Sequence, residues 1–137
     1  MELLRWKARF AVLWIIEAFG MSVFMFLFFM EPGVIEGIIS GHFGSSQISE
    51  GFLFYLAIFW FIPFILAFLS LTIKGSANRW TNFVLGILFA IFYAIDISNH
   101  AAGEEIPSVA FLITGILGIV AAALIAWHAW KLPKLEA

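Results

Sequence analysis

The sequence contains no cysteine among its 137 residues. This absence excludes disulfide bonds, C-x-x-C redox chemistry, iron–sulfur clusters held by thiolates and cysteine nucleophiles. Charged residues are also scarce, because they make up only 12% of the chain, against roughly 25% in soluble domains. The few Lys and Arg residues form no basic patch of the kind that binds nucleic acid, so we expect no nucleic-acid partner.

Hydrophobic residues dominate what remains. They make up 64% of the chain, against roughly 45–50% in soluble domains. Four apolar stretches, at about residues 10–30, 52–73, 80–100 and 109–130, each have the roughly 20 residues needed to cross a hydrocarbon core. We therefore predict an all-α integral membrane four-helix bundle, in which residues 1–137 form a single four-span transmembrane domain. The many Phe residues are expected to face lipid or to fill the core.

The first apolar stretch resembles the hydrophobic core of a signal peptide, because basic residues precede it. It is longer than the roughly 7–15 residues of such a core, and it lacks an A-x-A-like cleavage site. We therefore expect a first transmembrane helix that is retained.

The connections between the stretches carry turn and capping signals. Glu31-Pro32-Gly33 ends the first helix, and the helical spacing of apolar residues in 34–39 predicts a short amphipathic helix lying in the outer interface. A polar loop is expected over residues 41–51, where Ser46 or Ser49 can cap the second span.

The second and third spans are joined by so short a link that we expect them to be antiparallel neighbours. Lys74-Gly75 closes the second span and Ser76 is expected to cap the third, whereas Pro107 is expected to start the fourth. Pro63 lies near the middle of the second span. It removes the hydrogen bond to the carbonyl of Phe59, so we expect a kink there.

All basic residues fall on one side of this topology: Arg5, Lys7, Arg9, Lys74, Arg79, Lys131 and Lys134. The other side has none and carries acids instead: Glu31, Glu36, Glu50, Glu104 and Glu105. The positive-inside rule then predicts a multi-pass protein of the inner (plasma) membrane with both termini in the cytoplasm, an N-in, C-in topology. An aromatic belt at the same interface agrees with this orientation: Trp6, Trp80, Trp127 and Trp130.

Polar residues on the third span share one helical face. Alternating steps of four and three residues place six side chains on it: Asn82, Gly86, Phe89, Tyr93, Asp96 and His100. A lipid-facing stripe would not carry Asn, Asp and His, because an unpartnered polar group in hydrocarbon costs several kcal/mol. This face is therefore expected to look into the protein or into a wet cavity.

Five residues are candidates for a ligand or proton site: Glu17, Tyr93, Asp96, Asn99 and His100. Glu17 lies within the first span, where an ionisable residue marks a proton, ion or substrate site. The alternative is a neutral carboxyl that hydrogen-bonds another helix, for example at the Phe59 carbonyl. Asp96 and His100 lie one turn apart and can pair. They indicate either an outward-facing cation or proton site or a polar cap at the membrane surface.

Two further groups leave alternatives open. The cytoplasmic turn comprises Asn78, Arg79, Trp80 and Asn82. It indicates either a binding site for a lipid headgroup or partner protein, or an interfacial anchor with an interhelical amide bond. A small-residue edge on the fourth span predicts close packing within the bundle or in a dimer; it comprises Gly115, Gly118, Ala122 and Ala126. We expect no metal, because a third ligand would come from Glu104, Glu105 or His42, at a spacing that matches no known motif.

Several segments resemble a family of small bacterial four-span membrane proteins known only as a domain of unknown function. The matching segments are Glu31–Gly41, Ile48–Phe52, Pro63, Ala77-Asn-Arg-Trp-Thr-Asn82 and Ala126-Trp-His-Ala-Trp-Lys131. The Asn-Arg-Trp-x-Asn element is the most specific of them. The resemblance implies a four-helix membrane fold and a bacterial origin, and it supplies no activity or catalytic residues.

These observations leave two functions open. The first is a transporter, channel or binding protein for a proton, cation or small amphipathic solute, using Glu17 and the polar face of the third span. Four spans rarely enclose a pathway alone, so this function requires a homo-oligomer. The second is a structural or accessory membrane subunit, in which polar residues join helices and contact a partner protein. A membrane enzyme ranks third, because the sequence offers no recognisable catalytic constellation or cofactor site.

Overall fold

The computed structural model describes residues 1–102 and 108–132 of the chain. Four long helices dominate it: α1 (Glu2–Phe29), α3 (Glu50–Thr72), α4 (Gly75–Ala101) and α5 (Val109–Lys131). Each of them is long and apolar enough to cross a membrane. The predicted all-α fold with four membrane-spanning helices is therefore confirmed.

Two small elements connect α1 to α3. The first is α2 (Val34–Ile39), which lies where the sequence predicts a short amphipathic helix. The second is a hairpin of β1 (His42–Phe43) and β2 (Ser46–Gln47), which occupies part of the polar loop expected over residues 41–51. Gly44 has a φ of 58° in the turn between the strands, a conformation that glycine adopts without steric penalty.

The structure decides between the predicted caps. Ser49 caps α3, because its Oγ accepts a hydrogen bond from the backbone N of Phe52 at 3.2 Å. The prediction that Ser76 caps α4 is wrong: α4 begins at Gly75, and Lys74 is the N-cap without a side-chain bond. Gly75 has a φ of 61°, which lets the chain reverse in so short a link. Pro107 lies outside the described residues.

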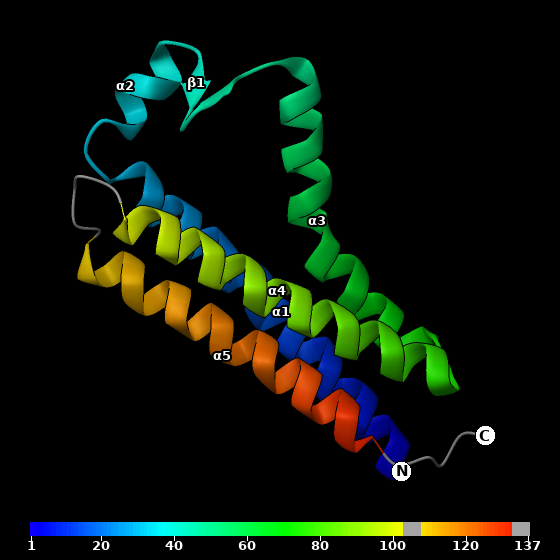
Figure 1. Ribbon diagram of the computed structural model, residues 1–137. Coiled ribbons are helices and arrows are strands. Elements are labelled where there is room, and N and C mark those ends of the chain that lie inside the picture. The colour runs from blue at the N-terminus through cyan, green and yellow to red at the C-terminus, as the bar shows by residue number, and fades with distance from the viewer. Residues whose placement is uncertain (103–107, 133–137) are drawn as a thin grey trace.

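The four long helices pack in a specific pattern, with α1 against α3 and α5, and α4 against α5 (Figure 1). The helices α3 and α4 make far fewer contacts with each other. Side chains join α1 to α4 across the core: the ring centroids of Trp14 and Phe89 lie 5.3 Å apart, and those of Phe24 and Tyr93 lie 5.5 Å apart.

The course of α3 changes near its middle. Its second half approaches the start of α4, where Ser70 bonds to Asn78 and Asn82, whereas its first half leans away from the other helices toward the hairpin (Figure 1). Pro63 lies inside this helix and is fully buried. The change of direction at this level is the expected effect of a proline within a helix.

The small-residue edge of α5 lies against α4. A Cβ atom on Gly86 of α4 would lie 2.8 Å from the backbone N of Ala126 and 2.9 Å from the carbonyl O of Ala122. A Cβ atom on Gly118 would lie 2.6 Å from Cζ of Tyr93. The two backbones therefore approach as closely as small residues allow, and the ring of Tyr93 packs directly against Gly118.

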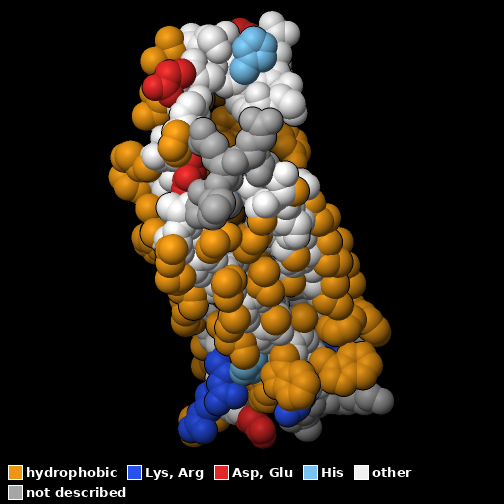
Figure 2. All heavy atoms as spheres, turned by 60° about the vertical axis from the view of Figure 1, so that its left-hand side comes forward, with side chains coloured by type: hydrophobic (Ala, Val, Ile, Leu, Met, Phe, Trp, Pro, Cys, Tyr) orange, Lys and Arg blue, Asp and Glu red, His pale blue; other side chains and the backbone are white. Residues whose placement is uncertain are grey.

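The surface has two distinct ends, separated by a broad hydrophobic belt (Figure 2). The Lys and Arg side chains gather at the end that holds the N-terminus, the α3–α4 turn and the last turn of α5, which we call the basic end. The other end carries α2 and the hairpin, and we call it the hairpin end. Three charged residues of the predicted pattern, Lys134, Glu104 and Glu105, lie outside the described residues.

Gly118→Ala is expected to lower the free energy of unfolding by about 1–3 kcal/mol, because the added methyl group overlaps the buried ring of Tyr93. Gly20→Ala is the matched control, since nothing lies within 4 Å of a Cβ atom there and alanine favours a helix. Thermal or denaturant unfolding in detergent measures the stability of both variants. Equal stability of the two variants would contradict the packing of α5 on Tyr93.

Candidate functional site

A cavity of about 580 Å³ opens at the hairpin end, where the first half of α3 leans away. We call it the hairpin-end cavity. Its lining comes from α1, the hairpin, α3 and α4: Met21, Phe24, Met25, Phe28, Phe43, Gly44, Ser45, Ser46, Phe52, Tyr55, Leu56, Phe59, Trp60, Phe92, Asp96, Asn99 and His100. Phe, Tyr and Trp rings thus form about half of the wall. The prediction that the Phe residues only face lipid or fill the core is incomplete.

The aromatic wall on α3 is fixed in place from two sides. Trp60 donates a hydrogen bond from Nε1 to Oγ of Ser22 on α1 at 3.1 Å, and Ser22 donates in turn to the carbonyl of Ala18. The ring of Phe59 stacks on Phe89, with centroids 6.0 Å apart. These contacts hold α3 to α1 and α4 just before Pro63, so α3 leans away only over the residues that precede Phe59.

The polar part of the cavity lies on the last turns of α4. Nδ1 of His100 donates to the backbone carbonyl of Asp96 at 2.8 Å and lies 3.7 Å from its carboxylate Oδ2. Both side chains are about one-third exposed, and Asn99 lines the cavity beside them. The structure thus brings together three of the five predicted site residues, with an acid among them and no Lys or Arg in the lining.

Glu17 and Tyr93 lie deeper and do not line this cavity. Glu17 is 1% exposed and Tyr93 is fully buried. Glu17 Oε1 and the Tyr93 hydroxyl have no hydrogen-bond partner within the part of the chain that the structure describes. The bond suggested between Glu17 and the Phe59 carbonyl is therefore not formed at Oε1. Because buried polar atoms are rarely left unpaired, two such atoms close to a cavity indicate a place for water, a proton or a ligand.

Glu17 lies one helical turn before Met21, which lines the cavity. Tyr93 lies on α4 between two lining residues, Phe92 and Asp96. The ring of Tyr93 also packs edge-on against Phe24, another lining residue. The two unpartnered groups therefore lie directly beneath the cavity, on its basic-end side. The five predicted site residues form an upper polar cluster and a lower buried pair.

A hydrogen-bond network around Asn82 joins the helices in the basic half of the molecule. Oδ1 of Asn82 accepts from Nε1 of Trp14 at 2.7 Å and from Oγ of Ser70 at 3.0 Å, and its Nδ2 donates to the carbonyl of Asn78 at 2.8 Å. Nδ2 of Asn78 donates to the carbonyls of Ser70 and Ile73. We call these four side chains, from α1, α3 and α4, the Asn82 network.

Arg79 and Trp80 of the predicted cytoplasmic turn lie outside this network. Nη2 of Arg79 donates to the carbonyl of Trp130 at 3.2 Å, and its guanidinium lies near the rings of Trp80 and Trp130. Arg79 thus binds a carbonyl in the last turn of α5, where a cation is favoured. The turn therefore divides into two parts, an interhelical amide pair and a cation at the surface.

The sequence interpretation missed three participants, Trp14, Trp60 and Ser70. Each is a hydrogen-bonding side chain within an apolar stretch, and this was the available signal, because such groups in a membrane need partners within the protein. No group of three metal-binding side chains occurs in residues 1–102 and 108–132. The alternative ligands Glu104 and Glu105 fall in the segment that is not described.

The helices, the hydrophobic belt and the buried polar contacts define a polytopic α-helical membrane protein. The chain belongs to the family of unknown function DUF6326, whose sequence profile matches residues 1–134. No curated protein and no solved structure is significantly similar to the chain.

Asn82→Leu is expected to lower the free energy of unfolding by about 1–3 kcal/mol, because it leaves Trp14 Nε1 and the Ser70 hydroxyl without their acceptor. Tyr93→Phe removes a buried hydroxyl that has no hydrogen-bond partner among the described residues, so stability should stay the same or rise. Chemical unfolding in detergent compares the two. A loss of stability in Tyr93→Phe as large as in Asn82→Leu would show that the hydroxyl is satisfied.

Proposed function

We propose that this protein binds a small amphipathic organic cation in the hairpin-end cavity. The observation that carries the proposal is the composition of the cavity wall, which combines aromatic rings with Asp96 and contains no Lys or Arg. A cation over an aromatic face gains roughly 0.5–2 kcal/mol. The opposite charge of a carboxylate adds to this attraction.

The size and shape of the cavity favour an organic molecule over a bare metal ion. Its volume of about 580 Å³ lies within the range of roughly 300–1,000 Å³ that is typical of small-molecule sites. The rings of Phe28, Phe59 and Phe92 offer apolar area to a hydrophobic body, whereas Asp96 and Asn99 offer polar contacts at one side. No Lys or Arg lines the cavity to attract an anion.

The position of the cavity supports entry of the cation from the hairpin end. The cavity lies where α3 leaves α4, and the Asn82 network joins α1, α3 and α4 toward the basic end. Transport is the extension of this proposal, in which Glu17 is the next acid that a cation meets on its way to the basic end. Passage would require the Asn82 network to separate and, for four spans, an oligomer.

Asp96→Asn is expected to weaken binding of tetraphenylphosphonium about tenfold, because it removes roughly 1.4 kcal/mol of charge attraction. Binding of the neutral triphenylphosphine oxide should change little. Equilibrium dialysis with the purified protein in detergent measures both affinities.

Glu36→Gln is the matched control for this experiment, because Glu36 is an exposed acid on α2 that does not line the cavity. Phe59→Ala should weaken binding of both compounds, since it removes apolar wall and no charge. Equal affinity of wild type and Asp96→Asn for the cation would contradict the proposed site. Absence of binding by a folded wild-type protein would favour an accessory role.

We also propose that the basic end faces the cytoplasm. The support is the clustering of Lys and Arg at one end (Figure 2), to which the positive-inside rule applies. The chain has no native cysteine, so Ser45→Cys at the hairpin and Ser76→Cys at the α3–α4 turn give clean labelling sites. In intact cells a membrane-impermeant maleimide should label position 45 and spare position 76. The reverse pattern would invert the orientation.

A further inference from the structure

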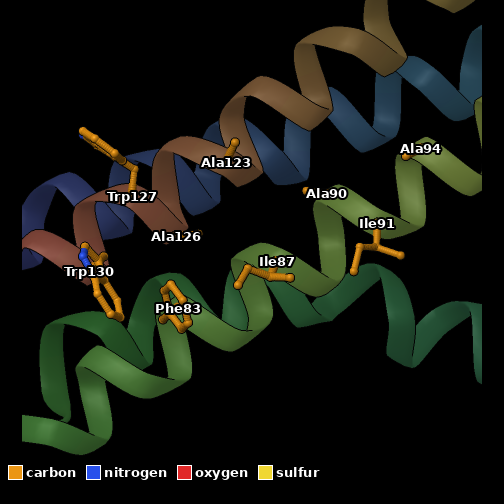
Figure 3. Close-up of a pocket in the computed structure, with 9 residues that line it drawn as sticks. All are labelled: Phe83, Ile87, Ala90, Ile91, Ala94, Ala123, Ala126, Trp127 and Trp130. Atoms are coloured by element: carbon orange, nitrogen blue, oxygen red, sulfur yellow. The ribbon is translucent and has the colours of Figure 1, made fainter.

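A second hollow lies on the membrane-facing side of the molecule, in a groove between α4 and α5 of about 450 Å³ (Figure 3). Phe83, Trp127 and Trp130 gather at its basic end, and Ile91 and Ala94 lie at the other end. Apolar side chains line all of it. We call it the α4–α5 groove, and it is separate from the hairpin-end cavity.

We infer that the α4–α5 groove binds one acyl chain of an anionic phospholipid, and that Arg79 and Lys131 hold its headgroup. The first argument is the chemistry of the groove. Its middle is formed by small side chains, Ala90 and Ala123, between larger neighbours such as Ile87. A flexible methylene chain fits such a channel and can fill it by van der Waals packing, which drives association within the hydrocarbon region.

The second argument is charge at one end. Nζ of Lys131 lies 4.1 Å from the ring centroid of Trp127, and the guanidinium of Arg79 lies 5.6 Å from that of Trp130. Each tryptophan that forms the end of the groove therefore carries a cation on its ring. Arg79 uses one donor on the Trp130 carbonyl, and a guanidinium has five, so donors remain for a phosphate.

The third argument is the length of the groove. The groove runs along α4 from Phe83 to Ala94, which at about 1.5 Å per residue is roughly 16 Å. This length matches one leaflet, half of a hydrocarbon core of roughly 30 Å. The cations and Trp rings then lie at headgroup level, where Trp is enriched. One phospholipid of the leaflet at the basic end thus has an acyl chain in the groove and its phosphate beside Arg79 and Lys131.

The test is native mass spectrometry of the detergent-purified protein with phosphatidylglycerol or phosphatidylcholine of identical acyl chains. Wild type should retain one phosphatidylglycerol in preference to phosphatidylcholine. Removing each cation should reduce this preference about fivefold, so Arg79→Gln/Lys131→Gln should bind the two lipids almost equally. The charge-retaining Arg79→Lys/Lys131→Arg should keep the preference.

Two further variants separate a site from general surface charge. Arg5→Gln/Arg9→Gln removes two cations of α1 that lie at the same basic end of the molecule. One of them, Arg9, also lies over a tryptophan ring. This double variant should leave the preference for phosphatidylglycerol intact. Ala123→Leu fills the groove from an exposed position and should reduce binding of both lipids. If Arg79→Gln/Lys131→Gln does not fold, Lys131→Gln alone should show the fivefold loss.

Three results would overturn the inference. The first is equal retention of the two lipids by wild type. The second is an equal loss of the preference in Arg5→Gln/Arg9→Gln, which would indicate attraction without a site. The third is a wild-type dimer that Ala123→Leu dissociates, which would make a second copy of the chain the occupant of the groove.

Discussion

Within a membrane, a buried amide must find its hydrogen-bond partners inside the protein, and the rest of this structure depends on how Asn82 does so. Its side chain accepts from Trp14 and Ser70 and donates to Asn78. These bonds join α1, α3 and α4 at one level near the basic end. They tie the second half of α3 to the start of α4, and the part of α3 that precedes Phe59 and Trp60 leans away from the other helices. The hairpin-end cavity is the consequence, because it occupies the space from which that part withdraws.

The same constraint makes Glu17 and Tyr93 informative. Both are as deeply buried as Asn82, yet each has an atom without a partner among the described residues. Packing around Tyr93 is tight, since its ring lies against Gly118 and edge-on to Phe24. A protein gains no stability from burying such atoms. Under the proposed function, their position below an acidic, aromatic cavity would let them extend a polar path inward from Asp96. In the same proposal, the Asn82 network lies between the cavity and the basic end, so a ligand would enter from the hairpin end.

Much of this architecture could be predicted from the sequence. Four apolar stretches and the small-residue edge of α5 follow from composition and spacing, and the polar face of α4 points inward as its residue types require. Asp96, Asn99 and His100 could be grouped because they lie on one helix. The division of the candidate site into an upper cluster and a lower pair could not be predicted, because it depends on where α3 bends in space and on which rings fill the gap. The hydrogen bonds of Trp14, Trp60 and Ser70 also join residues far apart in the sequence, and one chain alone does not reveal such pairs. The prediction that Ser76 caps α4 is wrong because Gly75 allows the helix to begin earlier.

The most direct measurement of the central claim is photo-crosslinking with a lipophilic cation that carries a diazirine, followed by peptide mapping. The account predicts that crosslinks compete with unlabelled cation and fall in the cavity wall, on residues 52–60 of α3 and 92–100 of α4. Labelling spread over lipid-facing positions such as Ile113 and Val120 of α5, without competition, would contradict a cation site in the hairpin-end cavity.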